Sequence, residues 1–175
     1  MIYESRGQKP ILAHTDGMMA SAAYAIGSAA DKIYISGNTT QVGSIGVMVT
    51  HYDYSAQDEK KGIKITHITA GKYKAVGVDS QPLSKEDREI IQAEIDYLYT
   101  GFVQDVARNR GVSAEQVLSD MAEGRVFIGK TAIMAKLVDG VLPLEKLIYE
   151  YSSANLPFIT RAVVEAKIRA FIPEA

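Results

Sequence analysis

The chain has 175 residues, with 19 Lys and Arg against 21 Asp and Glu and a formal net charge of −2. No block of Lys or Arg stands out, so the electrostatic footprint of a nucleic-acid-binding protein is missing and we expect no direct nucleic-acid ligand. The absence of cysteine excludes disulfides, thiolate zinc sites and cysteine nucleophiles, which leaves hydroxyls, amines, carboxylates and three histidines to carry chemistry.

The length and hydropathy predict one globular domain without a membrane span. The longest weakly polar stretch, residues 17–30, is small-sided and falls below the ~20 apolar residues that a membrane span needs. No cationic signal peptide leads the chain, so we expect a soluble, cytoplasmic protein. We assign 1–175 to a single domain, with a core at 10–142 and a helical tail at 143–175 that is interrupted at Pro157.

Short apolar runs alternate with helical segments in the first part of the chain, which predicts a layered α/β fold. The runs with the apolar or β-branched character of strands are "PILAHT" at 10–15, "KIYIS" at 32–36, "VMVTHY" at 47–52 and "IKITHITA" at 63–70. A helix is expected to begin near Ser21, after the first run. Turns are expected around these strands at Gly37, Asn38, Gly43 and Gly46.

The second half of the chain begins with a long amphipathic helix. Ser84 is placed to cap its first turn together with Asp87, and apolar residues follow at helical spacing until Gly111 stops the run. Its aromatic residues favour packing, or an interface if the protein is oligomeric.

A second capping pattern, from Ser113 to Gln116, predicts a short helix. The following stretch, "RVFIGKTAIMAKLVDGV" at 125–141, predicts a brief strand, a helix and a turn at Asp139 and Gly140.

Ser21 lies among small residues, between Ala20 on one side and Ala22 and Ala23 on the other. A serine nucleophile must be exposed at a sharp backbone turn with a base within reach, and small neighbours allow this. At a helix N-terminus its hydroxyl would lie beside free N–H groups, of which that of Ala22 is the natural oxyanion donor. The alternative interpretation is a helix that simply packs tightly on a sheet.

Lys74 is the candidate base for this serine. It lies in the loop "TAGKYKAVGVDSQPLS", flanked by Tyr73 and Ala75, directly after a predicted strand. Lysine acts as a base only when it is neutral, which requires desolvation or cationic and apolar neighbours that lower its pKa. The alternative interpretation is an exposed loop lysine beside Lys72.

Histidine offers a second kind of base, because His14 and His51 each lie at the end of a predicted strand. Either could approach Ser21, although a lone histidine at a strand end is more often structural. No pair of His or carboxylate residues has the spacing of metal ligands, so we expect no metal. Catalysis by a serine with a lysine base requires no organic cofactor, and we expect none.

Five segments in order resemble the signature of the signal peptide peptidase A family of Ser/Lys serine peptidases, peptidase family S49. They are "TDGMMASAAYAIGSAADKIYI", "VGSIGV", "GKYK", "PLSKEDREII" and "GRVFIGKTAIMAKLVDGV". The resemblance runs from about Pro10 to Val141. The branch most similar is the compact one that phages and prophages use for head maturation, with minor capsid protein C-type proteases.

The resemblance implies a Clp protease and crotonase type of fold. Members of the family carry further β/α units upstream, including a loop that supplies a second oxyanion donor, so we expect an N-terminally shortened version of this fold. Where the family has Gly-Gly after the nucleophile, this chain has Ala22 and Ala23. A shortened fold exposes a sheet edge that a second subunit would cover, which favours a homo-oligomer.

The resemblance also implies roles for individual residues. Ser21 takes the place of the nucleophile and Lys74 that of the general base, with Ala22 as oxyanion donor and Ser44 orienting the lysine amine. Backbone at three further positions would border the substrate groove, namely Gly43, Ile45 and Gly46.

The function implied is hydrolysis of peptide bonds by a serine endopeptidase, in capsid maturation or in degradation of signal-peptide-type substrates. Extended peptides would bind as an added strand, and partners would be a second copy of the chain and capsid or portal proteins. The location would be the bacterial host cytoplasm or the phage prohead. Two alternatives remain: an oligomeric scaffold or capsid assembly protein of the same fold with impaired catalysis, and acyl-CoA chemistry of the crotonase type.

Overall fold

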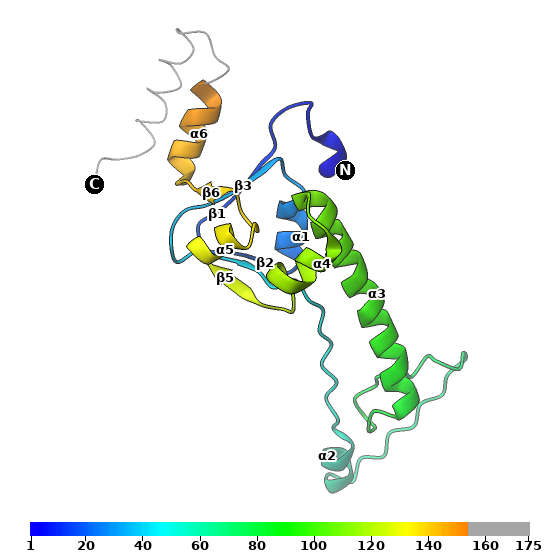
Figure 1. Cartoon of the computed structure of the whole chain (residues 1–175). Coiled ribbons are helices and arrows are strands. Elements are labelled where there is room, and N and C mark those ends of the chain that lie inside the picture. The colour runs from blue at the N-terminus through cyan, green and yellow to red at the C-terminus, as the bar shows by residue number, and fades with distance from the viewer. Residues whose placement is uncertain (154–175) are drawn as a thin grey trace. The chain divides into compact units, whose positions relative to one another are not determined.

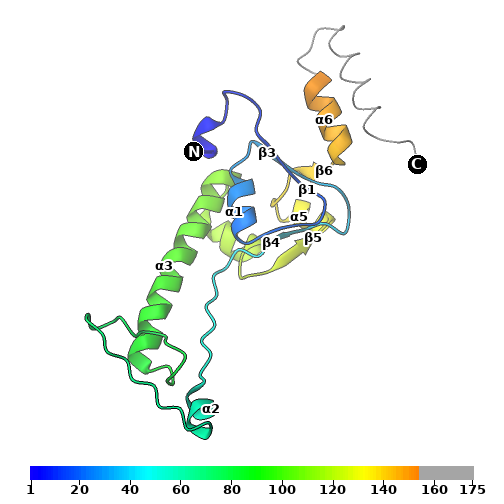
Figure 2. The ribbon, with the colours of Figure 1, turned by 180° about the vertical axis from the view of Figure 1, so that it is seen from behind.

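The computed structural model describes residues 1–153, and the chain forms two compact units (Figures 1 and 2). The first unit comprises residues 1–45 together with the described residues from 103 onward, and the second comprises residues 46–102. The interruption predicted at Pro157 lies outside the described residues. The assignment of the whole chain to one domain stays a prediction.

The first unit contains parallel and mixed sheets. The first sheet has the order β1-β3-β6, with all neighbours parallel, and comprises β1 (Leu12–Thr15), β3 (Lys32–Ile35) and β6 (Gly140–Val141). The second has the order β2-β4-β5 and comprises β2 (Met18–Ala20), β4 (Gln41–Gly43) and β5 (Val126–Ile128). There β2 runs parallel and β5 antiparallel to the central β4. The predicted α/β class is confirmed, and the Clp protease and crotonase type of fold stays a prediction.

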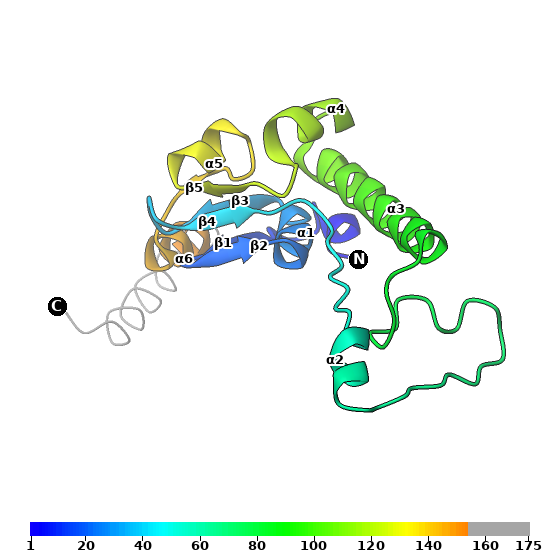
Figure 3. The ribbon, with the colours of Figure 1, turned by 90° about the horizontal axis from the view of Figure 1, so that it is seen from below.

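Helices lie before, between and after these strands. In chain order they are η1 (Tyr3–Ser5), α1 (Ala22–Ser28), the C-terminal end of α3 (Lys85–Arg110), α4 (Ala114–Gln116), the π-helical turn η2 (Val117–Met121), α5 (Lys130–Met134) and α6 (Leu144–Ser153). A single residue separates β2 from α1, and another separates β5 from α5. Each of these strands therefore leads directly into its helix (Figure 3). No helix in the described part of the chain is both long and apolar enough to cross a membrane.

Side chains from both sheets and their helices form the hydrophobic core of the first unit. In β3, Ile33 and Ile35 are fully buried whereas Lys32 and Tyr34 are not, as the period-two pattern predicts. The other large buried side chains include Tyr24, Ile45, Met121 and Leu137. Each apolar side chain of this size stabilises the fold by ~1.5–3 kcal/mol when it is buried.

The second unit has no buried side chain among residues 46–102. It contains α2 (Ser55–Lys60) and the first part of α3. The strands predicted at 47–52 and 63–70 are wrong, because both segments lack regular structure. A β-branched run becomes a strand only when a neighbouring strand satisfies its backbone groups, and residues 46–102 provide none.

The predicted helix boundaries are confirmed. The Ser84 hydroxyl accepts a hydrogen bond from the Asp87 N–H at 3.0 Å, and α3 ends at Arg110 before Gly111, whose φ is 65°. The Ser113 hydroxyl accepts from the Gln116 N–H at 3.1 Å and caps α4.

Two predicted turns are wrong, because both lie in sheets. Gly43 is the last residue of β4 and pairs with Ala20 and Val126. Gly140 is the first residue of β6 and pairs with Tyr34, because the preceding Asp139 N–H already donates to the Ile33 carbonyl at 2.8 Å.

The Asp139 carboxylate fastens β6 to β3. It accepts hydrogen bonds from the Ile33 N–H at 2.8 Å and from Arg110 at 3.1 Å, and the Lys32 ammonium lies 3.3 Å away. Burial alone would raise the pKa of Asp139, but the hydrogen bonds from Arg110 and Ile33 and the charges of Arg110 and Lys32 outweigh it and hold the pKa below its usual value. The folded state therefore favours the ionised form.

We expect Asp139→Asn to lower the free energy of unfolding by about 2 kcal/mol at pH 7, because hydrogen bonds to a charged group are lost. A lowered folded-state pKa stabilises the fold above the unfolded pKa of about 3.9, and this contribution is lost as the pH falls below it. Urea unfolding followed by circular dichroism should therefore show a gap between the two proteins that narrows below about pH 4. Asp105→Asn, which removes only the exposed ion pair with Arg108, is the matched control and should change little. A gap that stays constant down to about pH 3 would contradict the assignment.

Candidate active site

Ser21 lies at a strained turn between a strand and a helix. β2 ends at Ala20, α1 begins at Ala22, and Ser21 between them has φ 53° and ψ −125°. Its N–H donates to the Gly43 carbonyl at 2.8 Å, which continues the pairing of β2 with β4 by one residue. A non-glycine residue at positive φ costs of order 1–3 kcal/mol and persists only where its surroundings hold it. The Ser21 side chain is exposed at this turn.

Small residues let α1 lie close to β2. A Cβ atom on Gly27 would meet the Met19 sulfur at 2.3 Å, so any side chain there would force the buried Met19 side chain to shift. Tyr24, one turn after Ser21, is fully buried, and its hydroxyl donates to the Leu137 carbonyl at 2.8 Å. Burial raises the pKa of Tyr24, so its hydroxyl stays a neutral donor. The alanine and glycine content of this segment therefore serves tight packing and the exposed turn together.

Ser44 lies beside Ser21 at the same end of the sheet. Because β2 and β4 are parallel with Ala20 opposite Gly43, the two serines follow paired residues. Ser44 also has φ 53°, and its N–H donates to the Arg125 carbonyl at 2.7 Å. Gly43 has φ 107°, and a Cβ there would lie 2.9 Å from the Arg125 carbonyl oxygen. The two hydroxyl groups are thus carried by adjacent strained turns.

Ala22 is the first residue of α1, where backbone N–H groups have no acceptor within the helix. Its role as oxyanion donor stays a prediction. Ile45 is fully buried and its carbonyl accepts from the Gly124 N–H at 3.0 Å. Any contact of Ile45 with a peptide would therefore use its backbone N–H.

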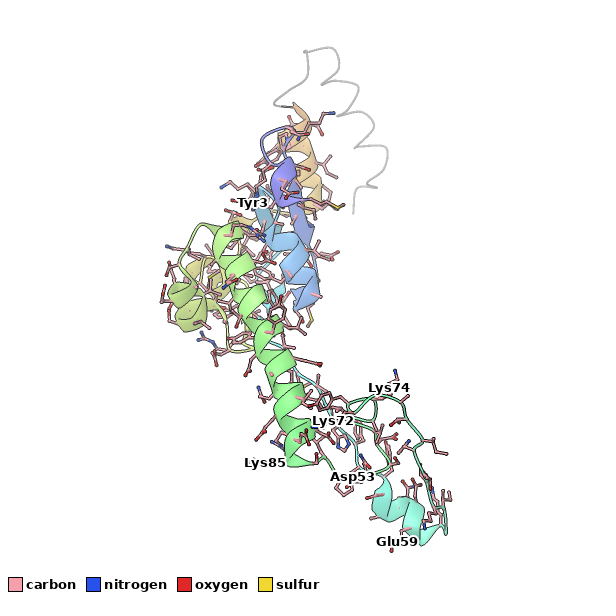
Figure 4. The ribbon with its side chains drawn as sticks, turned by 90° about the vertical axis from the view of Figure 1, so that its right-hand side faces the viewer. Tyr3, Asp53, Glu59, Lys72, Lys74 and Lys85 are labelled. Atoms are coloured by element: carbon pink, nitrogen blue, oxygen red, sulfur yellow. The ribbon has the colours of Figure 1, made fainter. Side chains whose placement is uncertain are left out.

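The structure brings five of the predicted site residues together in the first unit, and they are Ser21, Ala22, Gly43, Ser44 and Ile45. Lys74 and Gly46 belong to the second unit. Lys74 is exposed in the loop that precedes α3 (Figure 4), and its N–H donates to the Gly71 carbonyl at 3.2 Å. The pairing of Lys74 with Ser21 stays a prediction.

Lys72, two residues before Lys74, is held as a cation. Its ammonium lies 2.7 Å from a Glu86 carboxylate oxygen and 3.1 Å from the Tyr73 hydroxyl. The hydrogen bond to Glu86 raises the pKa of Lys72, with smaller contributions from Tyr73 and from the Glu86 charge. Of the two lysines in this loop, Lys72 is therefore the less suited to act as a base.

In both candidate histidines, one ring nitrogen lies within hydrogen-bond distance of a backbone carbonyl. His14 Nε2 lies 3.1 Å from the Leu142 carbonyl and 3.3 Å from the Ser36 hydroxyl, next to the first sheet. His51 Nε2 lies 3.0 Å from the Val78 carbonyl within the second unit. Each ring is thus oriented by a structural partner. Residues 1–153 contain no group of three His, Cys, Asp or Glu side chains that could hold a metal ion.

Arg6 is a residue that the sequence analysis missed. Its guanidinium donates to the Ala29 carbonyl at 3.0 Å, to that of Ser28 at 3.0 Å, to that of Ala30 at 2.7 Å and to that of Asn109 at 3.0 Å. These carbonyls lie at the C-terminal end of α1 and in the last turn of α3. No spacing rule connects Arg6 with a helix that begins sixteen residues later, so the sequence carried no signal of this contact.

The sequence profile of peptidase family S49 matches residues 4–154 of the chain. The chain is 36% identical over 139 residues to the capsid assembly protease C of Escherichia phage lambda, an alignment that covers 79% of this chain and 31% of the relative. It is 34% identical over 142 residues to the head-tail preconnector protein GP5 of Enterobacteria phage P21, with 81% and 28% covered. It is 31% identical over 151 residues to the chloroplastic serine protease SPPA of Arabidopsis thaliana, with 85% and 22% covered. The chain thus spans less than half the length of the curated relatives it matches.

The backbone strain at Ser21 predicts that, of two variants without the hydroxyl, the glycine variant is more stable than the alanine variant. Ser21→Gly should unfold with a free energy about 1 kcal/mol higher than Ser21→Ala, because glycine takes positive φ without steric cost. Urea unfolding of both proteins measures the difference. Ala25→Gly, at an ordinary helical position of α1, is the control and should destabilise by about 0.5–1 kcal/mol. Equal stability of the two Ser21 variants would show that the turn is unstrained.

Proposed function

The chain belongs to peptidase family S49, and on this basis we propose that it is a serine endopeptidase with Ser21 as nucleophile and Lys74 as general base. The observation that carries the proposal is the conformation of Ser21. Its φ of 53° at a turn from strand to helix exposes the hydroxyl beside the N-terminus of α1. Hydrolases with a serine nucleophile use such turns because the hydroxyl can reach a substrate carbonyl there.

The proposed reaction has two stages. In the first, the Ser21 oxygen bonds to the scissile carbonyl carbon while its proton passes to the neutral Lys74 amine. The carbonyl oxygen becomes an oxyanion that the Ala22 N–H stabilises, and the C–N bond then breaks as Lys74 returns the proton to the leaving amine. In the second stage, a water gives a proton to Lys74 and its oxygen bonds to the acyl carbon. The bond from this carbon to the Ser21 oxygen then breaks, and Lys74 returns the proton to that oxygen, which releases the new carboxyl group and regenerates Ser21.

Lys74 is a better candidate for the base than Lys72, because Lys72 is paired with Glu86. The Glu86 carboxylate keeps Lys72 charged, whereas a general base must be neutral when the serine attacks. We propose that Lys74 loses its exposure when it approaches the serine, because desolvation favours the neutral amine. The Ser44 hydroxyl, carried beside Ser21, would accept a hydrogen bond from this amine and orient it.

The proposed substrates are extended peptide segments. They would bind as an added strand along residues 43–47, with the backbone of Gly43, Ile45 and Gly46 bordering the groove. Two of the relatives are named as a capsid assembly protease and a head-tail preconnector protein of phages. We therefore propose capsid or portal proteins as partners, and the host cytoplasm or prohead as the place of action.

A homo-oligomer is also proposed, and the second unit supports it. Residues 46–102 bury no side chain, and large apolar side chains such as Met48, Ile68 and Tyr97 are at least 80% exposed. Soluble proteins rarely leave so much apolar surface uncovered. A second copy of the chain would cover it.

A fluorophosphonate probe tests the dyad directly, because it reacts only with an activated serine. We expect the probe to label Ser21, with a rate that rises from about pH 6 to about pH 10 as a lysine base becomes neutral. Lys74→Met should lower the labelling rate by at least about 100-fold, since general-base catalysis contributes 10²–10⁴-fold. Mass spectrometry of the labelled peptide identifies the site, and casein digestion is followed in parallel.

Lys72→Met is the matched control, since it removes a lysine of the same loop that is already paired with Glu86. Its labelling rate should stay within about threefold of that of the unchanged protein, because a lysine held as a cation by Glu86 does not serve as the base. Undiminished labelling in Lys74→Met would transfer the role of base to another residue, with His51 the first to test. Absence of labelling and digestion in the folded protein would favour an assembly protein without catalysis.

A further inference from the structure

Arg6 closes the end of α1 opposite to Ser21. The guanidinium donates to three consecutive carbonyls, those of Ser28, Ala29 and Ala30, at 3.0, 3.0 and 2.7 Å. The last carbonyls of a helix have no partner within it and carry partial negative charge, so a planar cation with several donors suits them. Arg6 therefore supplies hydrogen-bond donors to the carbonyl groups at the end of α1, which have no donor within the helix.

The same guanidinium joins α1 to the last turn of α3. Its Nη2 also donates to the Asn109 carbonyl at 3.0 Å, and the buried Asn109 side chain donates to the Ser28 hydroxyl at 2.9 Å. The Ser28 hydroxyl in turn donates to the Ala25 carbonyl at 2.9 Å, inside α1. This network fixes both the position and the rotation of the helix end.

α1 is short enough for this anchor to act at its other end. The helix has seven residues and is therefore about 10 Å long, and a rigid element of this length can carry a displacement from one end to the other. Its N-terminal end is held by the Ser21 N–H, which donates to the Gly43 carbonyl at 2.8 Å. A shift of the C-terminal end changes the angle at which α1 leaves β2, and the strained turn at Ser21 must absorb that change.

We infer that Arg6 is a positioning residue for Ser21, which it holds in its attacking orientation through α1. This inference rests on the proposed function. Arg6 does not touch the reacting atoms, so its loss should leave substrate binding intact and lower the rate of the chemical step. A displacement of about 1 Å at a reacting group can cost about 100-fold in rate, so we expect kcat to fall by roughly 10- to 100-fold with KM little changed.

Arg6→Ala and the milder Arg6→Lys are compared with Arg108→Ala. Arg108 is the matched control, because its guanidinium lies 4.8 Å from the centre of the Tyr3 ring, against 4.6 Å for that of Arg6. Arg108 pairs with Asp105 and with the Asn109 side chain and donates to no carbonyl of α1. Arg6→Lys keeps the charge but cannot form the same set of bonds, so it should be slow as well.

Three measurements are made on the full chain: the rate of fluorophosphonate labelling of Ser21, kcat and KM on a peptide substrate, and hydrogen exchange of backbone amides. In Arg6→Ala we expect slower labelling, lower kcat at similar KM, and faster exchange of the Ser21 to Tyr24 amides with exchange in β3 unchanged. Added ethylguanidinium, which matches the atoms removed, should restore part of the labelling rate of Arg6→Ala, which a merely misfolded protein would not show. Arg108→Ala removes an exposed ion pair with Asp105 and the hydrogen bonds to Asn109 Oδ1 but keeps every bond from Arg6, so its losses should be much smaller than those of Arg6→Ala.

Labelling and kcat of Arg6→Ala equal to those of Arg108→Ala would overturn the inference, as would a rise in KM alone. If the unchanged protein is not labelled at Ser21 at all, the proposed function fails, and hydrogen exchange still decides about Arg6. Faster exchange confined to Ser21–Tyr24 would support its positioning role, and unchanged exchange there would exclude it.

Discussion

The hydrogen bond from the Ser21 N–H to the Gly43 carbonyl is the constraint on which the candidate site depends. β2 and β4 are three residues long, and this bond extends their parallel pairing to the point where both chains leave the sheet. Ser21 and Ser44 then turn away with the same φ of 53°. Gly43 makes the arrangement possible, because a side chain there would collide with the Arg125 carbonyl. Two serine hydroxyls consequently lie at one edge of the sheet, on backbone that cannot relax independently.

Backbone strain of this kind persists only if the surrounding contacts prevent the chain from adopting a relaxed conformation. α1 is held at its start by the Gly43 carbonyl, in its middle by the Tyr24 hydroxyl on Leu137, and at its end by Arg6. The first two contacts end on carbonyls of β4 and of the segment between α5 and β6, whereas Arg6 joins the carbonyls at the end of α1 to the Asn109 carbonyl in α3. Contacts at its start, middle and end therefore fix the orientation of α1.

Local chemistry made much of this predictable from the sequence. Ser84 and Ser113 predict the starts of two helices, because their hydroxyl groups accept hydrogen bonds from N–H groups of the first turn. The small residues around Ser21 indicate the exposed turn. The family inferred from five ordered segments, with its phage members, is confirmed. What the sequence could not predict depends on partners far along the chain: the contact of Arg6 with α1, the pairing of Gly43 in β4, and the lack of a strand partner for 47–52 and 63–70.

The two halves of the proposed dyad lie in contrasting surroundings. Ser21 belongs to a unit with a well-packed core, and its geometry is fixed before any substrate arrives. Lys74 belongs to a unit without a buried side chain, and its own side chain is exposed. The nucleophile is thus preorganised, whereas the base requires desolvation that the second unit does not supply from its own residues. Under the proposed mechanism, Lys74 must therefore lose its exposure to water before it can take the proton of Ser21.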